Sequence, residues 1–142
     1  MSLVNLYEIA GSALTAQSVR LNAVASNLAN AGSAGTTAEA AYKPIQPIFE
    51  AVYDQTLDFG SETDLAARVK VKDLHREETG DEQMRYQPTH PMSNEEGYVF
   101  YPNINVVEQM ADMLSASRSY QTNLEVMVTA RKLQQRLLAL GQ

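Results

Sequence analysis

Two histidines and two neighbouring glutamates are the residues whose types and spacing come closest to a catalytic or metal-binding set. His75, Glu77 and Glu78 lie together, and a second histidine, His90, follows further along the chain. Imidazole and carboxylate groups are ligands of Zn²⁺, so this cluster is compatible with a metal site. However, the first three residues fall in a charged strand-and-turn region, which is usually a solvated face. His90 directly precedes Pro91, where turn geometry explains it.

No other pattern in the sequence predicts catalysis. The chain has no cysteine, which excludes disulfide bonds, thiol catalysis and cysteine-ligated metals. Gly32 and Gly35 do not form a phosphate-binding loop, and no spacing selects a set of serine, histidine and aspartate. We therefore expect no enzymatic activity, no cofactor and no metal. The alternative, a small enzyme, would make activity depend on His75 or His90.

The overall charge and the hydropathy pattern exclude two classes of partner. The formal net charge is −6, whereas contacts to nucleic-acid phosphates need a surplus of lysine and arginine. No apolar run approaches the ~20 residues of a membrane span. The first residues carry Glu8 and lack the basic and continuous apolar regions of a Sec-type signal peptide. We expect no nucleic-acid partner, no direct membrane insertion, and either a cytoplasmic location or export by another route.

Charge and proline content divide the 142 residues into three parts. Residues 1–38 carry only two charged side chains, residues 39–102 have a net charge of −7 and all five prolines, and residues 103–142 have a net charge of +1. We expect an N-terminal assembly helix in 1–35, a β-rich outer domain in 36–102 and a C-terminal assembly helix in 103–142. The expected fold class is α+β: long N- and C-terminal helices form a coiled-coil-like pair, with a small β-rich central domain inserted between them.

The N-terminal part has the spacing of a packed helix. Apolar and small residues recur at steps of four and three, as in a heptad stripe; the stripe is Leu3, Tyr7, Ala10, Leu14, Gln17, Leu21, Val24 and Leu28. The remaining positions are mostly alanine or uncharged polar residues, which is unusual for a solvated helix face. This pattern predicts a helix surrounded by protein on several sides. The helix should end within 30–35, where glycine, serine and asparagine allow a turn, and Pro44 and Pro47 should prevent it from resuming.

The C-terminal part predicts a longer helix. Its apolar residues recur at three and four; they are Val106, Met110, Met113, Tyr120, Leu124, Met127, Ala130, Leu133, Leu137 and Leu140. Either Asn103 or Asn105, after Pro102, is expected to cap its N-terminus. Basic residues near its end suit the helix dipole.

The expected helix lengths argue for packing between chains. About 28 and about 35 helical residues span ~42 Å and ~52 Å, more than the roughly 37 Å diameter of a compact globule of this size. Two helices that pack only against each other leave most of their surface exposed to solvent. Helices of other chains are therefore expected to cover the charge-poor flanks. The ends of an isolated monomer should be poorly ordered. The alternative is a self-contained helical adaptor or secreted regulator, which would be a stable, protease-resistant monomer.

Residues 42–102 have the alternation and turn signals of short strands. Apolar residues in 42–54 and alternating valine and lysine in 67–74 predict two strands. A turn is expected in 77–83 around Gly80, after which residues 84–88 would return as a strand. Residues 97–102 predict another short strand that Pro102 stops.

Two stretches of the chain resemble the flagellar axial family of rod, hook and hook-associated proteins. Residues 12–33, SALTAQSVRLNAVASNLANAGS, are similar to the family's N-terminal signature, and the NNIAN motif corresponds to Ser26–Asn30. Residues 90–133 are similar to the C-terminal half of the proximal rod branch, with His-Pro, Gly-Tyr-Val, Pro-Asn, Glu-Gln-Met and Ser-Arg-Ser-Tyr-Gln-x-Asn elements in order. The family's short Thr-x-Gly-Tyr is stretched here, because Tyr42 arrives ten residues after Gly32.

The resemblance implies a structural subunit of the bacterial flagellar basal-body proximal rod. Such subunits polymerise through their terminal helices into a hollow, torque-transmitting drive shaft, with the central domain facing outward. The implied partners are further copies of the chain, other flagellar rod proteins, the rod-base adaptor, MS-ring and export-gate components, and the flagellar type III export apparatus. The implied location is the periplasm-spanning rod, reached from the cytoplasm without a Sec signal.

The resemblance also assigns residues to an assembly interface. Two apolar sets are expected to pack against each other: Leu14, Leu21, Val24 and Leu28 against Met110, Leu114, Leu124 and Val128. The residues expected to bridge helices between subunits are Arg118, Tyr120, Gln121 and Asn123. The alternative makes Arg118 an exposed helix charge and Tyr120 a core residue. Asn27 and Asn30 are expected to terminate the helix and to bond to a neighbour's backbone.

Overall fold

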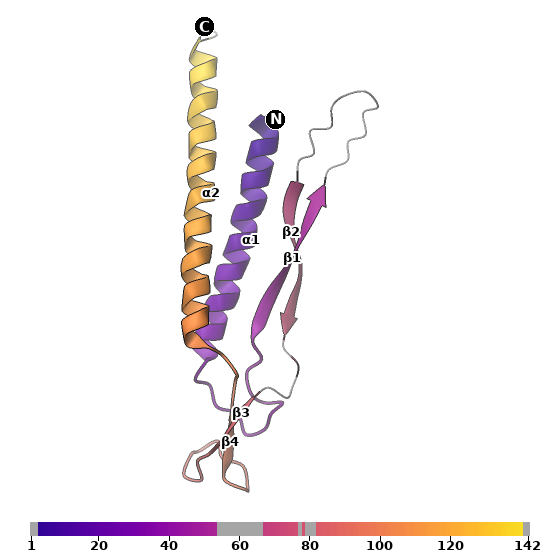
Figure 1. Cartoon of the computed structure of the whole chain (residues 1–142), viewed down its shortest axis with the longest axis vertical. Coiled ribbons are helices and arrows are strands. Elements are labelled where there is room, and N and C mark those ends of the chain that lie inside the picture. The colour runs from indigo at the N-terminus through magenta and orange to yellow at the C-terminus, as the bar shows by residue number, and fades with distance from the viewer. Residues whose placement is uncertain (1–2, 54–66, 77, 79–81, 141–142) are drawn as a thin grey trace.

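Two long helices dominate the computed structural model, which describes residues 3–53, 67–76, 78 and 82–140. Helix α1 is Leu3–Asn30 and helix α2 is Val106–Leu140. They lie side by side in opposite directions, so both chain ends are at one end of the molecule, and α2 extends beyond α1 (Figure 1). Their lengths of 28 and 35 residues confirm the expected helices, and the α+β class is confirmed as well.

In the part of the chain that the structure describes, four strands form two separate antiparallel pairs. Strand β1 (Ile45–Tyr53) pairs with β2 (Ala67–Arg76), and β3 (Gln83–Tyr86) pairs with β4 (Tyr98–Tyr101). The β1–β2 register shifts by one residue after Ile48, a β-bulge in a long two-stranded ribbon.

The expected return of residues 84–88 onto the preceding strand is wrong. Strand β2 pairs with β1 along its length, and β3 pairs with β4 instead. The partners match in length, nine residues with ten and four with four, so each ladder satisfies the backbone groups that face it. Most of the turn expected in 77–83 lies outside the described residues.

The β1–β2 ribbon lies along α1 on the side away from α2 (Figure 1). The backbone N–H of Val69 on β2 donates a hydrogen bond to Oγ of Ser12 on α1 at 3.2 Å. We expected other chains to cover the flanks of α1, but the chain's own ribbon covers one of them. This contact partly explains why the N-terminal arm carries so few charges.

The core between the helices consists mainly of small side chains. The buried apolar residues of the two helices are Ala10, Ala16, Ala23 and Val24 on α1 and Ala116 and Ala130 on α2. Alanine lets the helix backbones approach closely and is the best helix former. The core is therefore thin, and most large apolar side chains of α2 are left at the surface.

The chain leaves α1 through a tight segment that requires glycine at position 35. Gly35 exchanges two backbone hydrogen bonds with Phe100 of β4, at 2.8 and 3.0 Å. A Cβ atom at Gly35 would lie 2.7 Å from the backbone nitrogen of Ala41, so a larger residue would force the backbone to shift. This contact ties the segment after α1 to the β3–β4 pair at the end of the molecule away from both termini (Figure 1).

Candidate assembly surface

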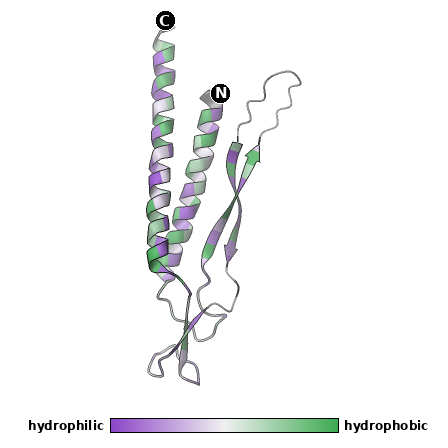
Figure 2. Ribbon diagram, in the orientation of Figure 1, coloured by the Kyte–Doolittle hydropathy of each residue, from purple (hydrophilic) through white to green (hydrophobic). Residues whose placement is uncertain are grey.

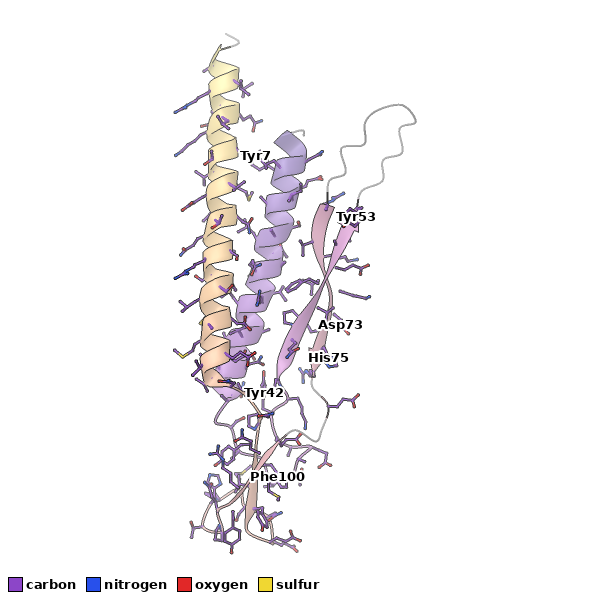
Figure 3. The ribbon with its side chains drawn as sticks, in the orientation of Figure 1. Tyr7, Tyr42, Tyr53, Asp73, His75 and Phe100 are labelled. Atoms are coloured by element: carbon purple, nitrogen blue, oxygen red, sulfur yellow. The ribbon has the colours of Figure 1, made fainter. Side chains whose placement is uncertain are left out.

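Asn27 lies at a junction of three elements. It is 2% exposed. Its Nδ2 donates to the carbonyl of Ile45 at 3.0 Å and to Oε1 of Gln109 at 3.2 Å, and its Oδ1 accepts from the N–H of Ile45 at 2.8 Å and the hydroxyl of Tyr42 at 3.1 Å. A side-chain amide has two donors and two acceptor positions, so all of them are used. Figure 3 shows Tyr42 at this junction, where the helix pair meets the β3–β4 end.

These bonds differ from the expectation that Asn27 terminates the helix and bonds to a neighbour's backbone. Asn27 lies inside α1, and the backbone that it binds is that of Ile45 in its own chain. The sequence interpretation also missed Gln109 and Tyr42 as its partners. A signal for Gln109 was present, because it is the central residue of the Glu-Gln-Met element.

Asn30 ends α1 as expected. Its Nδ2 donates to the carbonyl of Ser26 at 2.8 Å, one helical turn earlier. Its own carbonyl accepts from the N–H of Ser33 at 3.0 Å and from Oγ of Ser33 at 2.7 Å. These local bonds satisfy the end of the helix. A contact between Asn30 and another chain stays a prediction.

The two charged residues of the N-terminal arm each join α1 to a different neighbour. Nη2 of Arg20 lies 2.7 Å from Oδ1 of Asp112 on α2, and Oε2 of Glu8 lies 3.4 Å from Nη1 of Arg68 on β2. All four side chains are partly exposed, so each pair adds little stability. The main effect of these two ion pairs is on orientation, because they determine which face of α1 packs against α2 and which packs against the β1–β2 ribbon.

One face of α2 packs toward α1. Buried and half-buried positions at steps of three and four include Gln109, Met113, Ala116, Tyr120, Asn123, Met127 and Ala130. Four of the residues in the expected apolar stripe belong to this face: Met113, Tyr120, Met127 and Ala130. Five others are exposed: Val106, Met110, Leu124, Leu133 and Leu137.

A second apolar stripe on α2 is left uncovered by the chain. Its large side chains are Val107, Met110, Leu114, Leu124, Val128 and Leu138; we call these the exposed α2 stripe. Met110, Leu114, Leu124 and Val128 each follow a position of the α1-facing series by one residue, a rotation of about 100° around the helix. Leu114 is 62% exposed and Val107 is 76% exposed. Figure 2 shows that hydrophobic segments recur along α2, including the part beyond α1.

Within one chain, the two apolar sets expected to pack against each other differ in burial; they are Leu14, Leu21, Val24 and Leu28 on α1, and Met110, Leu114, Leu124 and Val128 on α2. The α1 residues are buried or half-buried, whereas the four α2 residues are all exposed and belong to the second stripe. A helix with two adjacent stripes buries only one of them against a single partner. Packing of these two sets between different chains stays a prediction.

The four residues of the C-terminal motif have different surroundings. Arg118 and Gln121 are exposed, Tyr120 is half-buried, and Nδ2 of Asn123 donates to the carbonyl of Ser119 at 2.9 Å. Arg118 makes no ion pair with any residue in the described part of the chain. Its predicted role between subunits is untested.

Two open hollows lie beside α1. One, of about 400 Å³, lies between α1, the start of β1 and the start of α2; we call it the three-element cleft. The other, of about 330 Å³, lies between Leu6 of α1 and residues 122–133 of α2, and is lined mainly by apolar and small side chains.

The candidate chemical residues occupy ordinary surface positions. His75 is exposed on β2 (Figure 3), and Glu77 lies outside the described residues. Nδ1 of His90 accepts a hydrogen bond from the N–H of Met92 at 3.1 Å, which confirms the turn interpretation. Within the described ranges, no three His, Cys, Asp or Glu residues are grouped so as to hold a metal ion. In the same part of the chain, no helix is long and apolar enough to cross a membrane.

Both terminal segments match families of flagellar rod proteins. Residues 8–35 match the family described as flagella basal body rod protein, and residues 95–140 match the one described as flagellar basal body rod FlgEFG protein C-terminal. The two matched segments include most of α1 and of α2.

Full-length relatives carry the same description. The chain is 42% identical over 142 residues to flagellar basal-body rod protein FlgC of Escherichia coli O6:H1 and 41% identical over 142 residues to that of Salmonella typhimurium, with 100% of both chains covered each time. It is 42% identical to FlgC of Agrobacterium fabrum over 129 residues, which cover 89% of this chain and 86% of that protein. The chain therefore belongs to the FlgC family of flagellar basal-body rod proteins.

Proposed function

We propose that this chain is a structural subunit of the bacterial flagellar basal-body rod, and that it polymerises through its terminal helices into a hollow, torque-transmitting shaft. The observation that carries the proposal is the exposed α2 stripe, on a helix that its own chain covers along one face only. Removing apolar surface from water is favourable by about 25 cal/mol per Å², before the entropic cost of association is subtracted. An exposed row of large apolar side chains of this kind marks an interaction site.

The three parts of the chain have separate roles in this proposal. Residues 1–35 and 103–142 are the assembly helices, and residues 36–102 are the outer domain. The α1 residues Leu14, Leu21, Leu28 and Asn30 are half-buried, which leaves part of each available to a neighbour. Residues 131–139 are all exposed, and α2 extends beyond α1 at this end of the molecule (Figure 1).

The role is structural rather than enzymatic, in agreement with the relatives, which are rod proteins by name. The partners are further copies of this chain, other rod proteins, the rod-base adaptor, and MS-ring and export-gate components. We infer that the chain is made in the cytoplasm and exported without a Sec signal by the flagellar type III apparatus. It then lies in the periplasm-spanning rod of the basal body.

The proposal is tested by substituting the exposed stripe. The full chain is expressed in its own host strain after deletion of the chromosomal copy, and swimming in soft agar and isolated basal bodies are compared. The wild-type chain should restore both. Leu114→Asp should abolish both, because burying a carboxylate in an apolar contact without a partner is unfavourable. The matched control is Leu74→Asp, at an exposed leucine of β2, which should leave both unchanged.

Two outcomes would contradict the proposal. If the wild-type chain restores neither swimming nor rods, then the chain is not the missing rod subunit. If Leu114→Asp assembles normal rods, then the exposed α2 stripe is not an assembly surface. Circular dichroism of the purified full-length variant checks that α1 and α2 are still formed.

A further inference from the structure

The three-element cleft has a polar wall and one aromatic wall. Arg20 and Val24 come from α1, Phe49 comes from β1, and Glu108 and Asp112 come from the first turns of α2. The cleft therefore exists only where all three elements meet, and the hydrogen bonds of the buried Asn27 hold them in place.

The charges in the cleft leave one carboxylate available. Asp112 is paired with Arg20 at 2.7 Å. Glu108 is exposed and makes no ion pair with any described residue. Phe49, which lines the same cleft, is 37% exposed. A carboxylate beside an exposed aromatic ring favours a guanidinium group, which pairs with the first and stacks on the second.

Arg118 carries the guanidinium group that the three-element cleft favours. It is exposed and unpaired among the described residues, and it follows the buried Ala116 by two positions. Two residues correspond to about 200° of rotation, so Arg118 lies on the side of α2 turned away from α1. Leu114 and Gln121 lie one helical turn to either side of it on the same face.

Arg118 cannot reach the cleft of its own chain. It follows Glu108 by ten residues on one straight helix, a separation of about 15 Å along the axis, and it is rotated by about 80° from Glu108 around that axis. The partner must therefore be in another molecule. A side chain on one face and its acceptor on a different face produce a head-to-tail contact, which closes into a ring or continues as a helix.

We propose that the three-element cleft of one copy receives Arg118 of the neighbouring copy of this chain, with the guanidinium paired to Glu108 and resting against Phe49. This inference rests on the proposed function and names the acceptor for one of its assembly residues. The contact joins the far side of α2 in one subunit to the α1–β1 side of the next. It is charge-assisted and should weaken with added salt.

A charge exchange in the complementation assay tests the pairing. Glu108→Arg and Arg118→Glu, each alone, should lower the number of rod-bearing basal bodies per cell by about tenfold or more, because like charges then meet across the contact. The double variant should restore most of the loss. The matched control, Glu96→Arg in the β3–β4 turn, should have no effect. Normal rod numbers in either single variant, or no recovery in the double variant, would overturn the pairing.

Crosslinking provides a second test that does not depend on loss of function. The natural chain has no cysteine, so Glu108→Cys copies and Arg118→Cys copies can be co-expressed and treated, in isolated basal bodies, with a short bis-maleimide reagent. Crosslinked dimers should form from this mixture and not from Glu96→Cys with Arg118→Cys. Assembled rods without the dimer would refute the cleft contact while leaving the proposed function intact. Failure of wild-type complementation would instead refute the proposed function.

Discussion

Asn27 shows how one polar residue can determine the geometry around it. Asparagine is a weaker helix former than alanine, and a buried amide without partners is costly. Here the cost is offset, because Tyr42, Ile45 and Gln109 satisfy both donors and both acceptors. The same bonds align the end of α1 with the starts of β1 and α2, so the residue acts on geometry more than on total stability.

At this scale we predict that Asn27→Ala lowers the free energy of unfolding of the full chain by about 2–4 kcal/mol. The substitution removes four hydrogen bonds and leaves the Ile45 backbone and the Gln109 amide without this partner in a buried site. Urea denaturation followed by circular dichroism measures the change. The control is Asn30→Ala, which loses a single side-chain bond to Ser26 and should cost less than about 1 kcal/mol. Equal costs for the two variants would contradict the role assigned to the junction.

Among the elements, α2 carries the most information about function, and its start is well defined. Oδ1 of Asn105 accepts hydrogen bonds from the N–H groups of Val107 at 3.1 Å and Glu108 at 3.4 Å. Of the two asparagines expected as caps, Asn105 is therefore the one that caps α2.

We predict that Asn105→Ala destabilises the full chain by about 1 kcal/mol, the usual cost of losing a helix N-cap. The same urea titration measures it. Asn103→Ala is the matched comparison, because Asn103 is exposed and only accepts a long bond of 3.4 Å from Gln83. It should change stability by a few tenths of a kcal/mol at most. A larger effect at position 103 than at 105 would reverse the assignment of the cap.

The whole molecule is elongated, with its firmest contacts at one end. The junction around Asn27 and the Gly35–Phe100 bonds lie near the end opposite the chain termini (Figure 1). At the end of the molecule that carries the chain termini, residues 131–139 of α2 are all exposed. Stability should therefore decrease along the long axis, and the weakest region is the one that the proposed assembly would cover.

Hydrogen exchange on the full chain at low concentration measures this gradient. We predict that amides of residues 131–139 exchange at nearly unfolded rates, while those of residues 20–30 and 109–116 are protected, because only the latter lie in the helix pair next to the junction. In isolated rods, residues 131–139 should become protected too. Strong protection of 131–139 in the monomer would favour the self-contained adaptor interpretation.

The sequence by itself determined the helices and the family. Heptad spacing, the proline positions and the asparagine cap are local features, so they predicted α1, α2 and the strand-forming centre. The sequence did not decide which face of α2 meets α1. Two adjacent stripes have the same spacing: one includes Met113 and Met127, and the other includes Leu114 and Val128. The sequence also did not decide that β2 pairs with β1, or that Asn27 binds Ile45, Tyr42 and Gln109. Those contacts join residues far apart in the chain, and only the packing of α1 between α2 and the ribbon selects them.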